Sequence, residues 1–256
     1  MKPFRALDPI LSGQVPRGIC ALAVMTKAPQ AGQVKTRLVP PLTRNEAAEL
    51  NKCFLHDTTA AILNATTDNE ASGVAVYTPV GSESAYAGLV PAGFSLLPQR
   101  GTGFGDRLYC ATDDLFKCGF ASVCLIDSDS PTVPASSFAR AVRQLAEPGD
   151  RVVLGPCDDG GYYLIGLKKP HRELFDRIDW STERVFDQTV DRASKLGLGA
   201  TLLPAGFDVD DAVSLRRLCD ELLGGKSTLT GDIASNTRRF LREIVAREGR
   251  DRIWPE

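Results

Sequence analysis

Two carboxylates separated by one residue, Asp127 and Asp129, directly follow a short apolar run. That run, residues 123–126, is typical of a strand buried on both faces of a parallel sheet. Ligands of open α/β sheets bind beyond the carboxyl ends of such strands. Carboxylate oxygens at this place suit Mg²⁺ or Mn²⁺, which prefer oxygen ligands and leave positions open for phosphate. The alternative is that both residues only cap the turn before a helix near Pro134.

Two further acidic loops have the same ambiguity. Asp210 lies in an acidic run, residues 207–212, that opens a predicted helix; it is a candidate second metal ligand, although acids are also favoured at helix N-termini. Asp159, Gly160 and Gly161 lie in a turn between two predicted strands. A carboxylate and two glycines there suit the positioning of an acceptor, but Asp-Gly is also a common hairpin turn.

A basic loop follows the first predicted strand. It contains Lys27, Lys35 and Arg37 around Gly32. Free backbone N–H groups and cationic side chains in such a loop bind phosphate. The loop is not a P-loop, because the Gly-x-x-x-x-Gly-Lys-Ser/Thr pattern is absent. Standing alone, it would equally well be a solvated basic turn.

A fourth loop, residues 101–108, alternates glycines, among them Gly103 and Gly105, before a predicted helix. Glycines allow close approach of the backbone to a ligand. The spacing falls short of the dinucleotide fingerprint, so an ordinary loop is the stronger interpretation of this segment by itself.

These loops must be positioned by an α/β framework. Apolar runs predict strands at 19–25, 73–78, 94–98, 122–127, 151–155, 162–167 and 201–204. Helical patterns cover 45–65, 105–118, 134–146, 182–196 and 212–223, and a last helix follows a linker that comes after Gly224-Gly225. The alternation predicts a mainly parallel sheet covered on both sides. We expect Ser181 or Thr182 to cap its helix, and Asp57, inside a helical stripe, to make a local polar contact.

Composition narrows the possible functions. The chain has 256 residues, 43% hydrophobic and 24% charged, which favours one large α/β domain. A net charge of −2 disfavours nucleic acid and anionic membranes as partners, and no apolar run is long enough to span a bilayer. Seven dispersed cysteines and two histidines argue against disulfides, a zinc site and histidine-based nucleophilic catalysis. Residues 1–18 lack the pattern of a secretory signal, so we expect a loosely ordered leader on a cytoplasmic protein.

Taken together, the motifs resemble a bacterial family of GT-A-like transferases, commonly labelled glycosyltransferases and often associated with arsenosugar biosynthesis. The resemblance spans about residues 19–223. It is carried by Lys27-x-Pro-x-x-Gly-x-x-Lys-Thr-Arg-Leu38, Ser128-Asp129-x-Pro131, the segment 154–167, Trp180-Ser-Thr182 and Asp208-Val-Asp210. The family is similar to nucleotidyltransferases that make molybdenum-cofactor dinucleotides, sugar nucleotides and phospholactyl-guanosine diphosphate. The chain departs from the family pattern at Asp127, Ser130 and Phe104.

The resemblance implies a single GT-A-like, Rossmann-like three-layer domain over 19–223, with 224–256 forming a linker and a helix on the same domain. It implies that Asp129 is the central metal ligand and Asp210 the second, with Asp127 as an extra ligand or a mere substitution. Lys27, Lys35 and Arg37 would bind nucleotide phosphates, and Asp159, Gly160 and Gly161 would face the acceptor or sugar.

Three functions remain open. The first is a metal-dependent glycosyltransferase that uses a nucleoside diphosphate sugar and a small-molecule acceptor, with Mg²⁺ or Mn²⁺ neutralising the leaving diphosphate. Asp129, Asp159 and Lys35 would then carry the chemistry. The second is a nucleotidyltransferase in which a substrate phosphate attacks a nucleoside triphosphate and releases pyrophosphate; the basic loop suits this charge better. The third is a catalytically idle binding module of the same fold.

Overall fold

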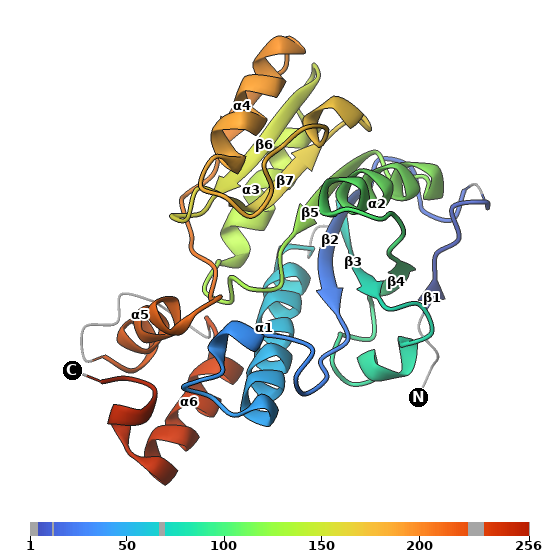
Figure 1. Ribbon diagram of the computed structural model, residues 1–256. Helices are drawn as coiled ribbons and strands as arrows, with labels where there is room; N and C mark the ends of the chain where they lie inside the picture. Colours follow the sequence, from blue (N-terminus) through green and yellow to red (C-terminus); the bar gives the residue numbers. More distant parts are fainter. Residues whose placement is uncertain (1–4, 12, 67–69, 225–232, 256) are drawn as a thin grey trace.

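The computed structural model describes residues 5–11, 13–66, 70–224 and 233–255. Within them, eight strands form one sheet in the order β1-β4-β3-β2-β5-β7-β6-β8 (Figure 1). Neighbouring strands are parallel except where β7 pairs with β5 and β6. The mainly parallel sheet expected from the alternation of strands and helices is therefore confirmed.

The element bounds follow the sequence prediction closely. The strands are β1 (Arg5–Ala6), β2 (Cys20–Lys27), β3 (Ala71–Thr78), β4 (Ser95–Pro98), β5 (Ser122–Ile126), β6 (Arg151–Pro156), β7 (Tyr162–Leu167) and β8 (Gly199–Leu202). The α-helices are α1 (Arg44–Ala65), α2 (Phe104–Cys118), α3 (Ala135–Ala146), α4 (Val185–Lys195), α5 (Ala212–Leu223) and α6 (Ser235–Glu248). The 3₁₀ helices are η1 (Thr36–Leu38), η2 (Glu83–Tyr86), η3 (Arg172–Leu174) and η4 (Arg250–Arg252).

The predicted cap of α4 was wrong. Helix α4 begins at Val185, and its N-cap residue, Arg184, makes no side-chain capping bond. The Thr182 hydroxyl instead donates to the Asp179 carbonyl at 2.7 Å, in the turn before the helix. A threonine can stabilise this turn as well as a helix start, and the sequence pattern does not distinguish the two.

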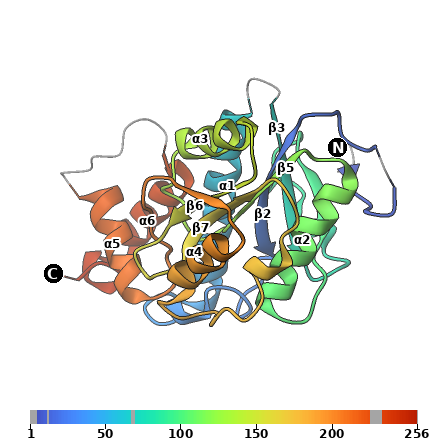
Figure 2. The same cartoon turned by 90° about the horizontal axis from the view of Figure 1, so that it is seen from above.

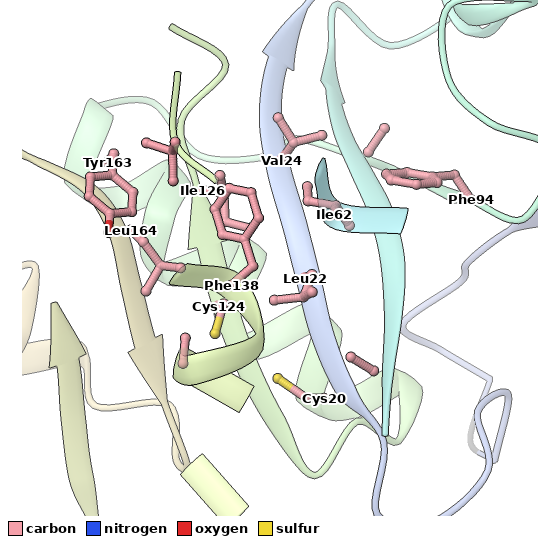
Figure 3. Packing of buried hydrophobic residues seen from close by; sticks show 14 of the residues in the cluster. Cys20, Leu22, Val24, Ile62, Phe94, Cys124, Ile126, Phe138, Tyr163 and Leu164 are labelled. Carbon is pink, nitrogen blue, oxygen red and sulfur yellow. The ribbon is translucent and has the colours of Figure 1, made fainter. Parts of the chain in front are cut away.

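The central strand β2 is buried on both faces. Leu22 and Val24 point into the core beneath α1 and α3, with Phe138 of α3 packed beside them (Figure 3). Ala21 and Ala23 alternate with them and face the opposite core, beneath α2 and α4. Figure 2 shows these helix pairs on the two sides of the sheet. This two-sided burial explains why β2 reads as a continuous apolar run.

Helix α1 also supports a third cluster away from the sheet. Its residues Leu50 and Phe54 pack against Leu215 of α5 and against Leu241 and Ile244 of α6. The last helix, predicted by its apolar stripe, is therefore docked on α1 (Figure 1). The linker expected after Gly224-Gly225 lies mostly outside the described residues, which resume at 233.

Asp57 of α1 makes a long-range contact rather than the local one expected. Its carboxylate is buried and accepts hydrogen bonds from the backbone N–H groups of Asn236 and Thr237 at 3.0 and 2.8 Å. It also accepts from the Asn236 amide and the Thr237 hydroxyl. Asp57 thus caps the first turn of α6, although 179 residues separate it from Asn236 in sequence.

We expect Asp57→Ala to lower the free energy of unfolding by about 2–3 kcal/mol, because the cap is lost and buried donors are left unpaired. Urea denaturation followed by circular dichroism measures this. Glu49→Ala is the matched control, since this exposed carboxylate on the same helix pairs only with Lys52 and should change stability by roughly 0.5 kcal/mol or less. Equal losses in the two variants would contradict the capping role.

The N-terminal segment contributes to the sheet. Arg5 and Ala6 form the edge strand β1 beside β4, and Leu7 is buried at 3% exposure. The described part of residues 1–18 is therefore bound to the domain through β1. This was not predicted from the sequence, because the segment shows no apolar periodicity. Among the helices of the described residues, none combines the length and hydrophobicity that crossing a bilayer requires.

Candidate active site

The candidate loops meet at one edge of the sheet. Strands β2 and β5 pair in register up to Val24 and Ile126, so the loops after both strands leave the same edge. The antiparallel strand β7 begins at this edge with Tyr162, which places the turn between β6 and β7 beside them. The carboxyl-end crevice expected for an α/β sheet is thus present.

The loop after β5 is held by Asp127. One of its oxygens accepts from the Asp129 backbone N–H at 3.4 Å, and the other accepts from the Ser130 hydroxyl at 2.7 Å. Burial, and then the charge of Asp129, raise the pKa of Asp127 well above its ordinary range. These hydrogen bonds match the alternative interpretation, in which Asp127 caps the turn after the strand. A metal-ligand role for Asp127 stays a prediction.

Lys35 lies between the two predicted metal ligands. Its ammonium is 2.8 Å from Asp129 Oδ1 and 2.9 Å from Asp210 Oδ1, and it also donates to the Val209 carbonyl at 2.8 Å. The side chain is only 4% exposed. Burial alone would lower the pKa of Lys35, but Asp129 and Asp210 outweigh it and raise that pKa. The structure therefore brings the three residues together as one ion-paired group.

The basic loop opens a polar cleft of about 260 Å³ on one side of this group. Lys27, Lys35 and Arg37 all line it, and Asp129 and Asp210 form its boundary. The Arg37 side chain is 70% exposed, with its nearest carboxylate oxygen 3.8 Å away. Arg37 is therefore available to an anionic ligand, whereas Lys35 is already engaged.

A second, larger cleft of about 330 Å³ lies on the other side of Asp129 and Asp210. Asp127, Asp159 and Asp208 also line it. Asp208 was not among the predicted site residues. It shares a period-two pattern with Asp210: Phe207 and Val209 are buried, whereas both aspartates are partly exposed and line the cleft. That alternation is the signal in the sequence that identifies Asp208.

The segment around Asp208 is placed by backbone pairing. Gly206 forms a parallel bridge with Cys157, which extends the sheet beyond β6, and the Val209 N–H donates to the Asp129 carbonyl at 3.0 Å. As a result, ligand atoms of Cys157, Asp159 and Asp208 lie within 4.8 Å of one another. This is the group of possible metal ligands that the described residues gather.

The Asp159–Gly161 turn is internally organised. The Gly161 N–H donates to Asp159 Oδ1 at 2.8 Å. Gly160 has φ +86°, and a Cβ there would collide with the Glu183 backbone. The turn is thus fixed against the segment that precedes α4, and Asp159 faces the larger cleft. The contacts give Gly160 a packing role; a ligand-binding role for Gly160 and Gly161 stays a prediction.

The glycine-alternating loop contributes an apolar wall. Gly103 is the N-cap residue of α2, with no atom near the place of a Cβ, and Gly32 of the basic loop has φ +75°. Gly105 lies against the Trp180 indole, so a Cβ there would displace it. The Phe104 and Trp180 rings meet edge to face at 5.0 Å and line the larger cleft. Contact of Gly32, Gly103 and Gly105 with a ligand stays a prediction.

Asp208 has an unfavourable environment for its charge. Burial first, and then the neighbouring carboxylates Asp159 and Asp210, raise its pKa from 3.8 to about 6. Because the pKa in the folded state exceeds that of the unfolded chain, the protonated form favours folding. This contribution to stability is complete below about pH 4 and is lost as the pH rises through about 6.

We expect Asp208→Asn to raise the melting temperature at pH 7.5 by a few degrees in EDTA, and to change it less at pH 5. Thermal unfolding of the variant and the wild type at both pH values measures the effect. Asp251→Asn, a change at an exposed carboxylate, is the control and should shift neither melting temperature appreciably. An Asp208→Asn variant that is less stable than the wild type at pH 7.5 would contradict an unfavourable environment for the Asp208 charge.

Comparisons with known proteins agree with this architecture. Residues 61–182 match the family DUF2064, described as an uncharacterized protein conserved in bacteria. No curated protein matches the chain. A crystal structure from Desulfovibrio desulfuricans G20, provisionally described as a nucleotide-diphospho-sugar transferase, is 29% identical and superposes with a TM-score of 0.77. The match covers 90% of this chain and 96% of that one.

More distant structures share the fold. A CMP:2-keto-3-deoxy-manno-octonic acid synthetase complexed with CTP is 10% identical, with a TM-score of 0.51 over 79% of this chain and 97% of that one. The protein Rv0371c of Mycobacterium tuberculosis H37Rv is 15% identical, with a TM-score of 0.50 over 80% and 98% of the two chains. The chain therefore has the GT-A/Rossmann-like fold of nucleotide-sugar transferases, and the comparisons support a nucleotide-dependent transferase.

Proposed function

We propose that this protein is a glycosyltransferase that takes a nucleoside diphosphate sugar as donor and a small hydroxyl compound as acceptor. The observation that carries the proposal is the division of charge between the two clefts. Three cationic side chains line the smaller cleft, and five carboxylates line the larger one, with Asp129 and Asp210 common to both. An anionic donor suits the first cleft, and an acceptor without negative charge suits the second.

The roles of the residues follow from this division. Arg37 and Lys27 are placed to bind the diphosphate, Arg37 with two parallel hydrogen bonds and Lys27 as a point charge. Lys35 holds Asp129 and Asp210 in position at the boundary where donor and acceptor meet. Asp159, at the wall of the larger cleft, accepts the proton of the acceptor hydroxyl.

The transfer step balances with these groups. The acceptor oxygen forms a bond to the anomeric carbon of the sugar while the bond from that carbon to the diphosphate oxygen breaks. The nucleoside diphosphate leaves with the electron pair of that bond, and the hydroxyl proton passes to Asp159. Positive charge grows on the sugar carbon during this step, which the surrounding carboxylates of the larger cleft stabilise.

The carboxylates also fit a divalent cation. They are the hard oxygen donors that Mg²⁺ and Mn²⁺ prefer. The raised pKa of Asp208 reflects burial first and then repulsion by Asp159 and Asp210, and a cation would relieve that repulsion. We propose that Asp129, Asp210 and Asp208 would hold the cation, which would neutralise the leaving diphosphate when bound. Cys157, a soft ligand, is unsuited to Mg²⁺.

Nucleotidyl transfer is the second candidate. The cationic loop favours it, because a triphosphate carries more charge than a diphosphate sugar. The larger cleft opposes it, since an attacking phosphate would have to enter among carboxylates, and no Lys, Arg or His of the described chain lines that cleft. The description of the D. desulfuricans protein agrees with glycosyl transfer. The association with arsenosugar biosynthesis stays a prediction from the sequence resemblance.

Product analysis tests the proposal. A thermal-shift screen of UDP-, GDP-, CDP-, ADP- and dTDP-sugars and of the nucleoside triphosphates, with Mn²⁺, identifies the donor through the rise in melting temperature. The donor is then incubated with protein and assayed for nucleoside diphosphate and for pyrophosphate. Release of nucleoside diphosphate from a nucleotide sugar is expected. Release of pyrophosphate from a triphosphate would overturn the proposal in favour of nucleotidyl transfer.

A further inference from the structure

Two chemically different groups of side chains line the larger cleft. The first group is the carboxylates, namely Asp127, Asp159 and Asp208 in addition to the shared Asp129 and Asp210. The nearest cation to these groups, Lys35, has its ammonium fully engaged by Asp129, Asp210 and a backbone carbonyl. An anionic group in this cleft therefore meets repulsion, and no free cationic side chain among the lining residues offsets it.

The second group of lining side chains is apolar and aromatic. Phe104 remains 51% exposed although it is a large apolar side chain at the first turn of α2. Trp180 lies edge to face against it, and Met25, Leu108 and Tyr162 complete the surface. Exposed aromatic surface at a cleft is typical of a binding site for a ring.

The aromatic wall depends on specific local structure. Gly105 has no side chain, and the Trp180 indole occupies the space that a Cβ would need. The Phe175 carbonyl lies on the same side of Gly105. Trp180 is thereby held against α2 beside Phe104, so the wall exists before any ligand arrives. A preformed aromatic surface binds a ring without the cost of ordering side chains.

We infer that the acceptor is an uncharged or cationic hydroxyl compound that carries an aromatic or flat apolar ring, and that Phe104 determines this specificity. The ring packs on Phe104 and Trp180, while the hydroxyl group extends toward Asp159 in the same cleft. This inference rests on the proposed function, because it assigns the larger cleft to the acceptor. Carboxylated and phosphorylated acceptors are disfavoured by Asp159 and by the other charged carboxylates of the cleft that a bound cation does not neutralise.

Trp180 itself reports on binding. The chain has two tryptophans, and the other, Trp254, pairs with Asp220 in the C-terminal part of the chain. In a Trp254→Phe background, intrinsic fluorescence therefore follows Trp180 alone. The probes are phenyl β-D-glucopyranoside and its 4-aminomethyl and 4-carboxy derivatives, titrated without donor and with saturating Mg²⁺. Uridine and guanosine are titrated in parallel.

The neutral and cationic phenyl glucosides are expected to change Trp180 fluorescence and to bind at least about 10-fold more tightly than the carboxylated one. Phe104→Ala should weaken binding of the phenyl glucosides by about 10-fold or more. Val213→Ala, at an exposed apolar residue of α5, should leave their binding unchanged. Equal binding of the carboxylated probe, unchanged binding in Phe104→Ala, or saturation by the nucleosides instead of the phenyl glucosides would each overturn the inference.

The titration is independent of the test of the proposed function. It contains no donor, so its result does not depend on turnover or on the identity of the leaving group. Release of nucleoside diphosphate in the product assay, together with failure of the phenyl glucosides to bind, would reject this acceptor class and leave glycosyl transfer standing. Binding of the phenyl glucosides with pyrophosphate release would reject glycosyl transfer instead.

Discussion

Asp129→Asn is expected to lower turnover by about 10³-fold or more while the protein stays folded. The substitution removes one negative charge and almost no volume at the boundary of the two clefts. In the proposed mechanism, binding of a divalent cation and neutralisation of the leaving group would both depend on that charge, so the loss should fall on the transition state. The Asp129 Oδ1 atom also pairs with Lys35, whose ammonium would keep Asp210 as a partner.

The measurement is kcat and KM for the donor, with Mg²⁺ or Mn²⁺ at saturating concentration. Asp158→Asn is the matched control: Asp158 lies at the same edge of the sheet but pairs with Arg217 at 2.5 Å and is not among the residues that line either cleft. The control should keep nearly normal activity. Near-normal activity in Asp129→Asn, with a melting temperature close to that of the wild type, would rule out the proposed role of this carboxylate.

The strands and helices were predictable because burial of a strand or of one helix face produces a local pattern of apolar residues. The continuous apolar run of β2 is one example. The apolar stripe of α5 is another, since this helix was predicted at 212–223 and is observed at Ala212–Leu223. The two-residue strand β1 is too short to produce any periodicity. The start of α4 was misplaced because Thr182 satisfies a turn instead of the helix N-terminus.

The clustering of Asp129, Asp159 and Asp210 was predictable from the sequence, whereas the presence of Asp208 and the contacts within the candidate site were not predicted. The carboxylates Asp129, Asp159 and Asp210 follow strand ends, and strands of a parallel sheet bring such ends together. The burial of Lys35 between two carboxylates depends on Asp210, which is 175 residues away in sequence. No local pattern encodes such a partner. The same holds for Asp57, whose partners lie in α6.

The ion-paired position of Lys35 makes its removal the second large effect. In Lys35→Ala, Asp129 and Asp210 lose the ammonium that separates them, so two carboxylates repel each other at the boundary of the clefts. A lower melting temperature is expected as well, although the loss is smaller than for a fully buried ion pair because Asp129 and Asp210 are partly exposed. Activity must therefore be measured well below the melting temperature of the variant.

In glycosyl transfer, charge develops on a diphosphate that the donor already carries, and the reacting carbon becomes more positive. Lys35→Ala should then raise the donor KM by about 10-fold or more, because donor binding and transfer both need the carboxylate pair that Lys35 holds in position, and should lower kcat less than Asp129→Asn does. In nucleotidyl transfer, charge accumulates on the α-phosphoryl oxygens in the transition state, and kcat should fall strongly. Arg37→Ala is the comparison variant. The Arg37 side chain is 70% exposed, so its removal should raise the donor KM without lowering the stability of the protein. A fall in kcat for Lys35→Ala larger than that of Asp129→Asn, with an unchanged donor KM, would contradict glycosyl transfer.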